Sequence, residues 1–180
     1  MPEPRITSIY VTPTALIAGH RRLPYACGRG GFRLQKREGD GATPCGRFAL
    51  REVWYRPDRL AAPQTALPCR PIRRRDGWCD DPDHPAYNRP VAFPFAGRAE
   101  HLWRADPLYD LIAVLGHNDA PPVPGLGSAI FAHVARRNFA PTEGCIALRR
   151  GDLLWLLARC GPTSAFVIGP RAGANTRPAR

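Results

Sequence analysis

Lysine is almost absent from this 180-residue chain: Lys36 is the only one, so the other 25 of the 26 basic residues (26 − 1 = 25) are arginines. The 26 basic and 15 acidic residues give a net charge of +11. A charge of this sign suits binding to a nucleic acid, an anionic surface or an anionic substrate. The arginines are scattered along the chain, with one dense run at 73–75. No zinc finger, basic helix with heptads or RRM-type aromatic motif accompanies them, so we expect a solvated basic surface and no nucleic-acid partner.

Long apolar runs are also missing. None approaches eighteen residues, so we expect no membrane span. The first 22 residues place prolines and an acid before any apolar run, and they lack the basic and apolar regions of a normal secretory signal. These features do not determine the cellular compartment of the protein.

The sequence has no Cys-x-x-Cys pair among its six cysteines. A chain of this length can bury a core and does not depend on disulfides. The spacing of Cys69, Cys79 and His84 matches no common zinc site, although Cys69 and Cys79 are close enough for a disulfide in an oxidising compartment. The remaining cysteines outside the central stretch are expected to be small buried hydrophobes: Cys27, Cys45 and Cys160.

Hydrophobic patterning predicts a mainly β domain of the α+β type. Short strands are expected at 6–11, 14–18, 46–54, 109–115, 128–134 and 166–168. The glycine-rich segment at 28–31 lacks the Gly-Lys-Ser/Thr ending of a phosphate loop and is expected to form turns. Segment 100–110 is expected to contain a short helix. One longer helix is expected after Cys145, with Asp152 in its first turn, a leucine face at 153–157, and Gly161-Pro162 as its end.

We expect one domain at residues 1–170 and a basic tail at 171–180. The proline-rich segment at about 56–94 has no sustained period, and its aromatic and acidic residues favour an ordered insertion that helps to wall a site.

The stretch 131–148, FAHVARRNFAPTEGCIAL, places His133 twelve positions before Cys145. A thiol next to a glycine turn, within reach of an imidazole, is what cysteine acyl transfer requires. Gly144 permits a positive φ, so the backbone amides of Gly144 and Cys145 could both face a developing oxyanion. The period of two would put His133 on the face of its strand that carries Phe131 and Ala129.

These residues resemble the L,D-transpeptidase catalytic domain of the YkuD type. That family has a histidine at the end of an apolar strand and then a Ser-His-Gly-Cys-Ile-Arg-Leu-like signature. The upstream segment GDGATPCGRFAL is similar to the family's Thr-Pro-x-Gly-x-Phe/Tyr strand. The resemblance spans roughly residues 15–170. It implies a YkuD-like β-sandwich with a helix after the cysteine, Cys145 as nucleophile, His133 as proton donor and acceptor, and Gly144 at the oxyanion turn.

The chain departs from this signature at three positions. Thr142 and Glu143 stand where the family has Ser-His, and Ala147 stands where it has arginine. The Thr142 hydroxyl can replace that of serine, whereas Glu143 cannot replace a histidine donor, so substrate contacts near the thiol must differ. Arg149 or Arg150 could supply the missing positive charge. We therefore name Thr142, Glu143 and Arg149 as candidate substrate-binding residues.

The resemblance implies that Cys145 attacks the carbonyl between the third-residue diamino acid and D-alanine of a peptidoglycan stem tetrapeptide. An amine then resolves the thioester to give a 3→3 cross-link, and water gives L,D-carboxypeptidase activity. The partners implied are peptidoglycan stem peptides, with neither cofactor nor metal ion. The implied location is the cell envelope or periplasm, while the lack of a recognisable signal keeps the cytoplasm open.

Two other functions remain open from the sequence. One is a thiol hydrolase that uses the same dyad on another amide, and the other is a non-catalytic, basic envelope-binding module. Outside the central stretch, His117 is expected in an exposed loop or, as the less favoured alternative, facing the same cleft. Packing within the insertion is favoured slightly over lining the groove for four further residues: Trp78, Asp81, Tyr87 and Arg89.

Overall fold

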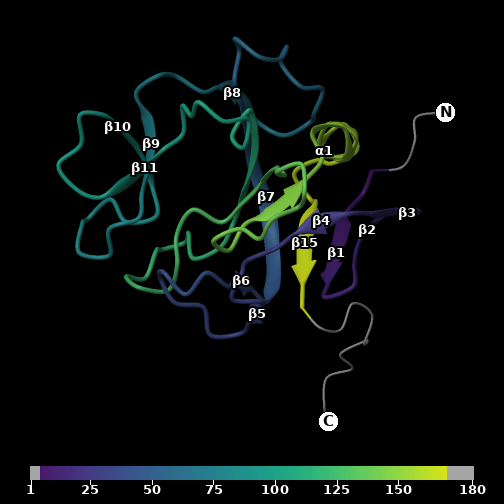
Figure 1. Cartoon of the computed structure of the whole chain (residues 1–180), viewed down its shortest axis with the longest axis horizontal. Helices are drawn as coiled ribbons and strands as arrows, with labels where there is room; N and C mark the ends of the chain where they lie inside the picture. Colours follow the sequence, from purple (N-terminus) through teal and green to yellow (C-terminus); the bar gives the residue numbers. More distant parts are fainter. Residues whose placement is uncertain (1–4, 170–180) are drawn as a thin grey trace.

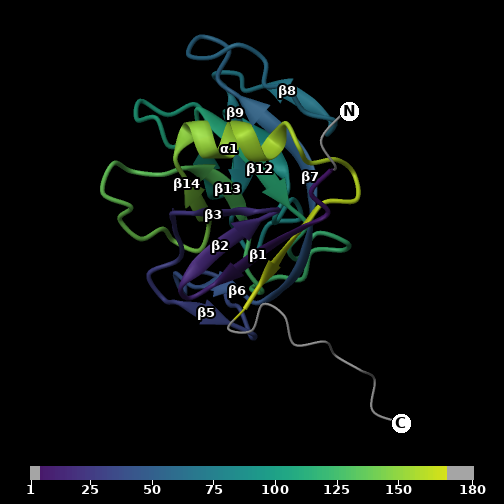
Figure 2. The ribbon, with the colours of Figure 1, turned by 90° about the vertical axis from the view of Figure 1, so that its right-hand side faces the viewer.

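The computed structural model describes residues 5–169, and its main element is one ten-stranded sheet. Its strands follow the order β3-β2-β1-β15-β7-β12-β13-β14-β4, and β8 pairs with β7 outside this path. The members are β1 (Ser8–Thr12), β2 (Ala15–Ala18), β3 (Arg21–Leu23), β4 (Tyr25–Ala26), β7 (Gly46–Tyr55), β8 (Cys69–Pro71), β12 (Leu111–Leu115), β13 (Phe131–Val134), β14 (Ile146–Leu148) and β15 (Ala165–Ile168). Only Pro24 separates β3 from β4, the two ends of this order, so the sheet curls back toward itself (Figures 1 and 2).

Two small sheets complete the β structure. One has the order β10-β9-β11 and is built from β9 (Asp76–Cys79), β10 (Pro90–Ala92) and β11 (Ala99–His101). The other pairs β5 (Phe32–Arg33) with β6 (Thr43–Pro44) in parallel. In Figure 1 the β9–β11 sheet lies on the opposite side of β7 from β1 and β15.

The helix α1 (Arg150–Leu157) begins two residues after β14. Its buried side chains, Leu153, Leu156 and Leu157, follow the spacing of one helical face, and α1 packs against β13. Within residues 5–169 no helix has the length and apolar character needed to cross a membrane.

The mainly β fold with one helix after Cys145 is confirmed, as are the predicted strands near 6–11, 14–18, 46–54, 109–115, 128–134 and 166–168. The short helix predicted within 100–110 is wrong. Glu100 pairs instead with Trp78 across β11 and β9, and the Asp106 carboxylate accepts a hydrogen bond from the Leu108 N–H (3.3 Å). Pro107 has no N–H to donate to a helix, so turns follow β11.

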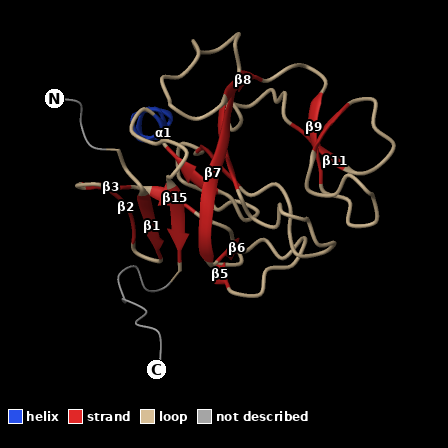
Figure 3. Ribbon diagram, turned by 180° about the vertical axis from the view of Figure 1, so that it is seen from behind, coloured by secondary structure: helices blue, strands red, loops and turns tan. Residues whose placement is uncertain are grey.

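The segment predicted as an irregular insertion, 56–94, is mostly loop (Figure 3). Arginines stacked on tryptophans hold it against neighbouring segments: Arg70 lies 3.8 Å from the centre of the Trp54 ring, and Arg56 lies 3.7 Å from that of Trp103. The predicted tail at 171–180 lies outside the described residues, and the single-domain boundary at residue 170 stays a prediction.

The strands at the centre of the sheet are buried on both faces. One face contributes to a large apolar core with α1, and the other to a second cluster that contains Trp54, Trp78, Phe131 and Cys145. The Trp78 ring meets that of Phe131 edge-on at 5.1 Å. The insertion therefore covers the face of the sheet to which the predicted nucleophile belongs.

Candidate active site

Two neighbouring parallel strands bring His133 and Cys145 to one face of the sheet. In β13 and β14, Ala132 pairs with Ile146 and His133 pairs with Ala147. Alternate side chains of these strands enter the large apolar core: Ala132, Val134, Ile146 and Leu148. Because side chains alternate along a strand, His133 and Ala147 face the other side, which is also the side of Phe131 and Cys145.

His133, Cys145, Thr142 and Glu143 line one pocket of about 420 Å³. Asp80, one of the acidic residues of the segment predicted to wall a site, also lines it. The rest of the charged and aromatic lining comes from residues that sequence reasoning did not single out: Glu38, Glu100, Arg104, Tyr109 and Arg136. These residues lie far apart in the sequence and carry no shared motif. Only the tertiary structure therefore identifies them as residues of one pocket.

The Cys145 thiol is held by backbone groups. It donates a hydrogen bond to the carbonyl of Ala129 (3.2 Å) and accepts one from the N–H of Phe131 (3.4 Å). Burial raises the pKa of this thiol to about 12, and the Glu100 charge adds to the rise, while the Phe131 N–H opposes it. The resting sulfur is therefore a neutral thiol at pH 7.

His133 is buried, with 3% of its surface exposed, and its Nδ1 lies 2.9 Å from the carbonyl oxygen of Val134. A carbonyl only accepts, so we assign the proton of the neutral ring to Nδ1, which leaves Nε2 as the basic nitrogen. Burial lowers the pKa of His133 to about 4, with the positive charges of Arg104 and Arg136 acting in the same direction. Imidazole and thiol are thus both neutral at rest, and the thiol proton is directed at Ala129.

The carbonyl that accepts the hydrogen bond of the Cys145 thiol belongs to Ala129, a residue with a strained backbone. Ala129 has φ +52°, a left-handed conformation that costs a non-glycine residue about 1–2 kcal/mol. Its N–H donates to the side-chain oxygen of Asn88 (3.1 Å), which also accepts from the indole N–H of Trp78 (2.9 Å). Asn88 lies in the insertion and is buried. The insertion therefore supports the backbone on which Cys145 rests.

The turn before Cys145 is fastened by two threonines. The Thr142 hydroxyl donates to the carbonyl of Cys145 (2.7 Å) and accepts from the N–H of Gly144 (3.2 Å). The buried Thr43 hydroxyl donates to the carbonyl of Gly144 (2.9 Å) and accepts from the N–H of Gly28 (2.8 Å). The hydroxyl of Thr43 in the upstream Thr-Pro segment thus ties the glycine-rich turn to the nucleophile turn.

Glycine is required at position 144 for two reasons. Its φ is +133°, and a Cβ there would lie 2.8 Å from the backbone oxygen of Ala42. The Gly144 N–H, predicted to face an oxyanion, is directed to the Thr142 hydroxyl in this structure.

Of the other predicted substrate contacts, Glu143 lies at the pocket and Arg149 does not. The Glu143 carboxylate accepts a hydrogen bond from Arg29 Nε at 2.9 Å, and both side chains are exposed. Arg149 instead lies over the ring of Phe139, 5.5 Å from its centre. The positive charges that line the pocket belong to Arg104 and Arg136.

The buried Tyr109 and the half-buried Glu100 support the imidazole. The Tyr109 hydroxyl donates to Glu100 (2.7 Å), and the Tyr109 ring meets that of His133 edge-on at 5.4 Å. The Arg104 guanidinium lies 3.9 Å from the Glu100 carboxylate. It forms a bidentate salt bridge with Asp106, through Nε (2.8 Å) and Nη2 (2.7 Å). Burial raises the pKa of both Glu100 and Tyr109.

None of the four insertion residues considered from the sequence lines this pocket: Trp78, Asp81, Tyr87 and Arg89. The packing interpretation is confirmed for Trp78 and Tyr87, which are buried, whereas Arg89 is exposed. Asp80 lines it instead. His117 is half-buried against Phe48 (5.3 Å), its Nε2 lies 2.9 Å from the Leu126 carbonyl, and it belongs to a separate cavity. The cleft-facing alternative for His117 is thus wrong.

All six cysteines are free thiols, so Cys69 and Cys79 do not form the disulfide considered from the sequence. No cluster of three or more His, Cys, Asp or Glu side chains in residues 5–169 is arranged to hold a metal ion.

The chain was compared with known proteins. The family model of the L,D-transpeptidase catalytic domain (YkuD) matches residues 11–168. Searches among curated proteins and among solved structures gave no match. The family match runs from the end of β1 to the end of β15 and includes His133 and Cys145. The chain therefore belongs to the YkuD family of L,D-transpeptidase catalytic domains, cysteine-dependent enzymes of peptidoglycan.

Proposed function

We propose that this chain is a peptidoglycan L,D-transpeptidase in which Cys145 is the nucleophile and His133 the general acid and base. The observation that carries the proposal is the shared pocket, where adjacent parallel strands hold a thiol and an imidazole. The Val134 carbonyl fixes the ring through Nδ1 and so keeps Nε2 available for a proton. Because the substrate is a wall polymer, we also propose a location in the cell envelope.

The neutral state of both groups determines the order of events. The thiol proton passes to His133 Nε2 as sulfur attacks the carbonyl between the diamino acid and D-alanine, so a resting ion pair is not needed. We assign the oxyanion to the Cys145 N–H, because the Gly144 N–H already donates to Thr142. The C–N bond then breaks, and His133 returns the proton to the leaving D-alanine amine. The Cys145 thioester remains.

Arg136 is the group we propose for the terminal carboxylate of the donor stem. It lines the pocket, its side chain is exposed, and within residues 5–169 it forms no ion pair. Arg104, the other arginine of the pocket, is already committed to Asp106. A guanidinium without a partner is suited to two-pronged recognition of a carboxylate.

The proposal is tested by intact-mass measurement after incubation with a carbapenem and, separately, with a disaccharide tetrapeptide. We expect a covalent adduct on the wild type and on Cys69→Ala, a variant that removes an exposed thiol outside the pocket. Cys145→Ala should give no adduct with either compound, and His133→Asn should acylate far more slowly. A wild type that forms no adduct with either compound rules out the transpeptidase and favours a binding module, and an adduct on Cys145→Ala would mean that another residue is the nucleophile.

A further inference from the structure

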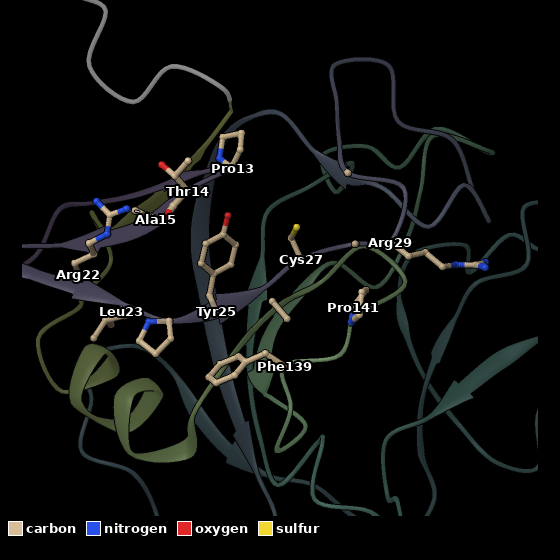
Figure 4. Close-up of a pocket in the computed structure, with 14 residues that line it drawn as sticks. Pro13, Thr14, Ala15, Arg22, Leu23, Tyr25, Cys27, Arg29, Phe139 and Pro141 are labelled. Atoms are coloured by element: carbon tan, nitrogen blue, oxygen red, sulfur yellow. Dashed lines mark hydrogen bonds between the residues drawn. The ribbon is translucent and has the colours of Figure 1, made fainter.

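Cys145 is held from two sides, and the support is built differently on each. On one side lies a separate groove of about 800 Å³, along which Figure 4 shows Cys27, Arg29 and Pro141. There the turn before Cys145 is held by backbone pairs: the Thr142 N–H donates to the Cys27 carbonyl, and the Arg29 N–H donates to the Thr142 carbonyl (both 2.9 Å). These bonds join backbone groups and depend on no particular side chain.

On the other side the support depends on the side chain of Asn88, a buried residue of the insertion at 56–94. The Ala129 carbonyl accepts the thiol hydrogen bond of Cys145 (3.2 Å), and the Ala129 N–H donates to the Asn88 side-chain oxygen (3.1 Å). Because the N–H and the carbonyl belong to one residue, fixing the N–H restricts the direction in which the carbonyl points.

The Asn88 amide uses its full hydrogen-bonding capacity. Its oxygen also accepts from the indole N–H of Trp78 (2.9 Å), and its nitrogen donates to the carbonyls of His117 (3.0 Å) and Asn118 (2.7 Å). The reverse orientation of the amide would set its N–H groups against two N–H donors and its oxygen against two carbonyls. Only the present orientation satisfies all four contacts, so the amide oxygen stays directed at Ala129.

Two residues with left-handed backbone meet at this contact. Asn88 has φ +54° and Ala129 has φ +52°. Asparagine adopts this conformation more readily than most residues, whereas for alanine it is strained. A strained residue keeps its conformation only where its surroundings hold it there. The hydrogen bond from the Ala129 N–H to Asn88 is a contact that does so.

We propose that Asn88 is a positioning residue for acyl transfer, which holds the Ala129 carbonyl toward the Cys145 thiol and so keeps the sulfur in one rotamer. The proposal rests on the proposed function. In that rotamer the sulfur lies between the Ala129 carbonyl and the Phe131 N–H (3.4 Å), in the pocket that Cys145 shares with His133. The two other staggered rotamers would lose both contacts. As sulfur attacks the substrate carbonyl, only the thiol proton has to change its acceptor, from Ala129 to His133 Nε2.

Asn88→Gly tests the proposal, because glycine adopts a positive φ without strain and only the side chain is lost. We expect the maximal rate of carbapenem acylation to fall about tenfold, as for the loss of one hydrogen bond. The carbapenem concentration that gives half of the maximal rate should stay the same, since Asn88 does not line the Cys145 pocket. A maximal rate that is unchanged or higher overturns the proposal.

Asn118→Gly is the matched control. Asn118 also has a positive φ (+49°), and its side chain makes three hydrogen bonds within the loop at 118–127: two with Val123 (2.8 and 3.0 Å) and one with Gly127 (2.9 Å). This variant should lose stability to urea much as Asn88→Gly does and yet be acylated at the wild-type rate. Equal losses of rate in the two variants would show a general effect of destabilisation and overturn the proposal.

Asn88→Asp is the conservative variant. Its carboxyl oxygens can still accept from the N–H groups of Ala129 and Trp78, but it loses donors to the carbonyls of His117 and Asn118. It should therefore be less stable than the wild type and still recover most of the acylation rate that Asn88→Gly loses. A tenfold loss of rate in Asn88→Asp overturns the proposal, whether or not Asn88→Gly folds.

An infrared measurement separates this proposal from the proposed function. The spectrum of the wild type minus that of Cys145→Ala isolates the S–H stretch of Cys145, whose frequency falls when the thiol donates a hydrogen bond. Asn88→Gly should raise this frequency and Asn118→Gly should not, and a band that does not move in Asn88→Gly overturns the proposal. A wild type that is never acylated refutes the transpeptidase itself, and the S–H band then still decides whether Asn88 orients the thiol.

Discussion

The neutral resting state of Cys145 leads to a quantitative prediction about alkylation by iodoacetamide. At pH 7 a pKa of about 12 leaves roughly one thiol in 10⁵ as thiolate, against about 3% for a cysteine with an unperturbed pKa near 8.5. That is a loss of roughly 3.5 powers of ten in thiolate, of which the greater nucleophilicity of a more basic sulfur recovers about 1.5. Cys145 should therefore react about a hundredfold more slowly than an ordinary cysteine, before any steric effect of burial.

The measurement is site-specific alkylation, followed by peptide mass spectrometry between pH 6 and pH 9.5. The exposed Cys69 is the internal reference. The rate at Cys145 should rise about tenfold for each pH unit without levelling off, because its pKa lies above this range. His133→Asn should leave this rate nearly unchanged and yet slow acylation by a carbapenem at least a hundredfold, since only the second reaction needs a general base.

Two results would refute this account. A plateau in the alkylation rate below pH 8, or a rate at pH 7 equal to that of Cys69, would mean that a thiolate–imidazolium pair already exists at rest. In the same way, carbapenem acylation should decline only below about pH 5, as His133 with its pKa near 4 becomes protonated and can no longer accept the thiol proton. A decline centred at pH 6.5 would indicate an unperturbed imidazole.

Two further predictions concern the support of the site. Gly144→Ala should lower the free energy of unfolding by about 1–3 kcal/mol and prevent acylation, because the φ of Gly144 and the Ala42 carbonyl exclude a Cβ. Gly151 lies in α1 with open space around it, so Gly151→Ala should raise the free energy of unfolding by roughly 0.5–1 kcal/mol. Glu100→Gln should gain stability relative to the wild type as the pH rises from 4 to 7. The pKa of Glu100 is raised in the folded state, so the wild-type carboxyl favours folding while protonated and loses that contribution on ionising, whereas glutamine keeps an acceptor for Tyr109.

Urea denaturation at the two pH values measures both effects. Equal stability of the two alanine variants would show that position 144 tolerates a side chain. A Glu100→Gln variant whose stability relative to the wild type is the same at both pH values would mean that burial does not raise the pKa of this carboxyl.

Glu143 stands at the position where the resemblance predicts a histidine. Its carboxylate pairs with Arg29 at 2.9 Å. Gly41 leaves room for this pair, because a Cβ there would lie 2.9 Å from Arg29 Nε and 3.4 Å from the Glu143 carboxylate. The substitution at 143 therefore belongs with residues 29 and 41, which no local motif connects to it.

The sequence by itself determined the features that depend on local pattern. Alternating apolar residues predicted β7, and a continuous apolar run predicted β13. The leucine spacing predicted α1, and Gly144 directly before Cys145 indicated a tight turn next to a thiol. It also indicated that His133 and Phe131 share a face, because side chains alternate along any strand. It failed for 100–110, where pairing of Glu100 with Trp78 overrode a weak helical pattern.

Only the tertiary structure decided what surrounds the dyad. Thr43 contacts Gly144, Asn88 contacts Ala129 and Tyr109 contacts His133, over separations in sequence that no spacing rule covers. The pKa values of Cys145 and His133 likewise depend on burial by the tertiary structure, since desolvation is the largest cause of both shifts. A residue type shows what chemistry is available, but the protonation state and the partners of that residue depend on what the whole fold places around it.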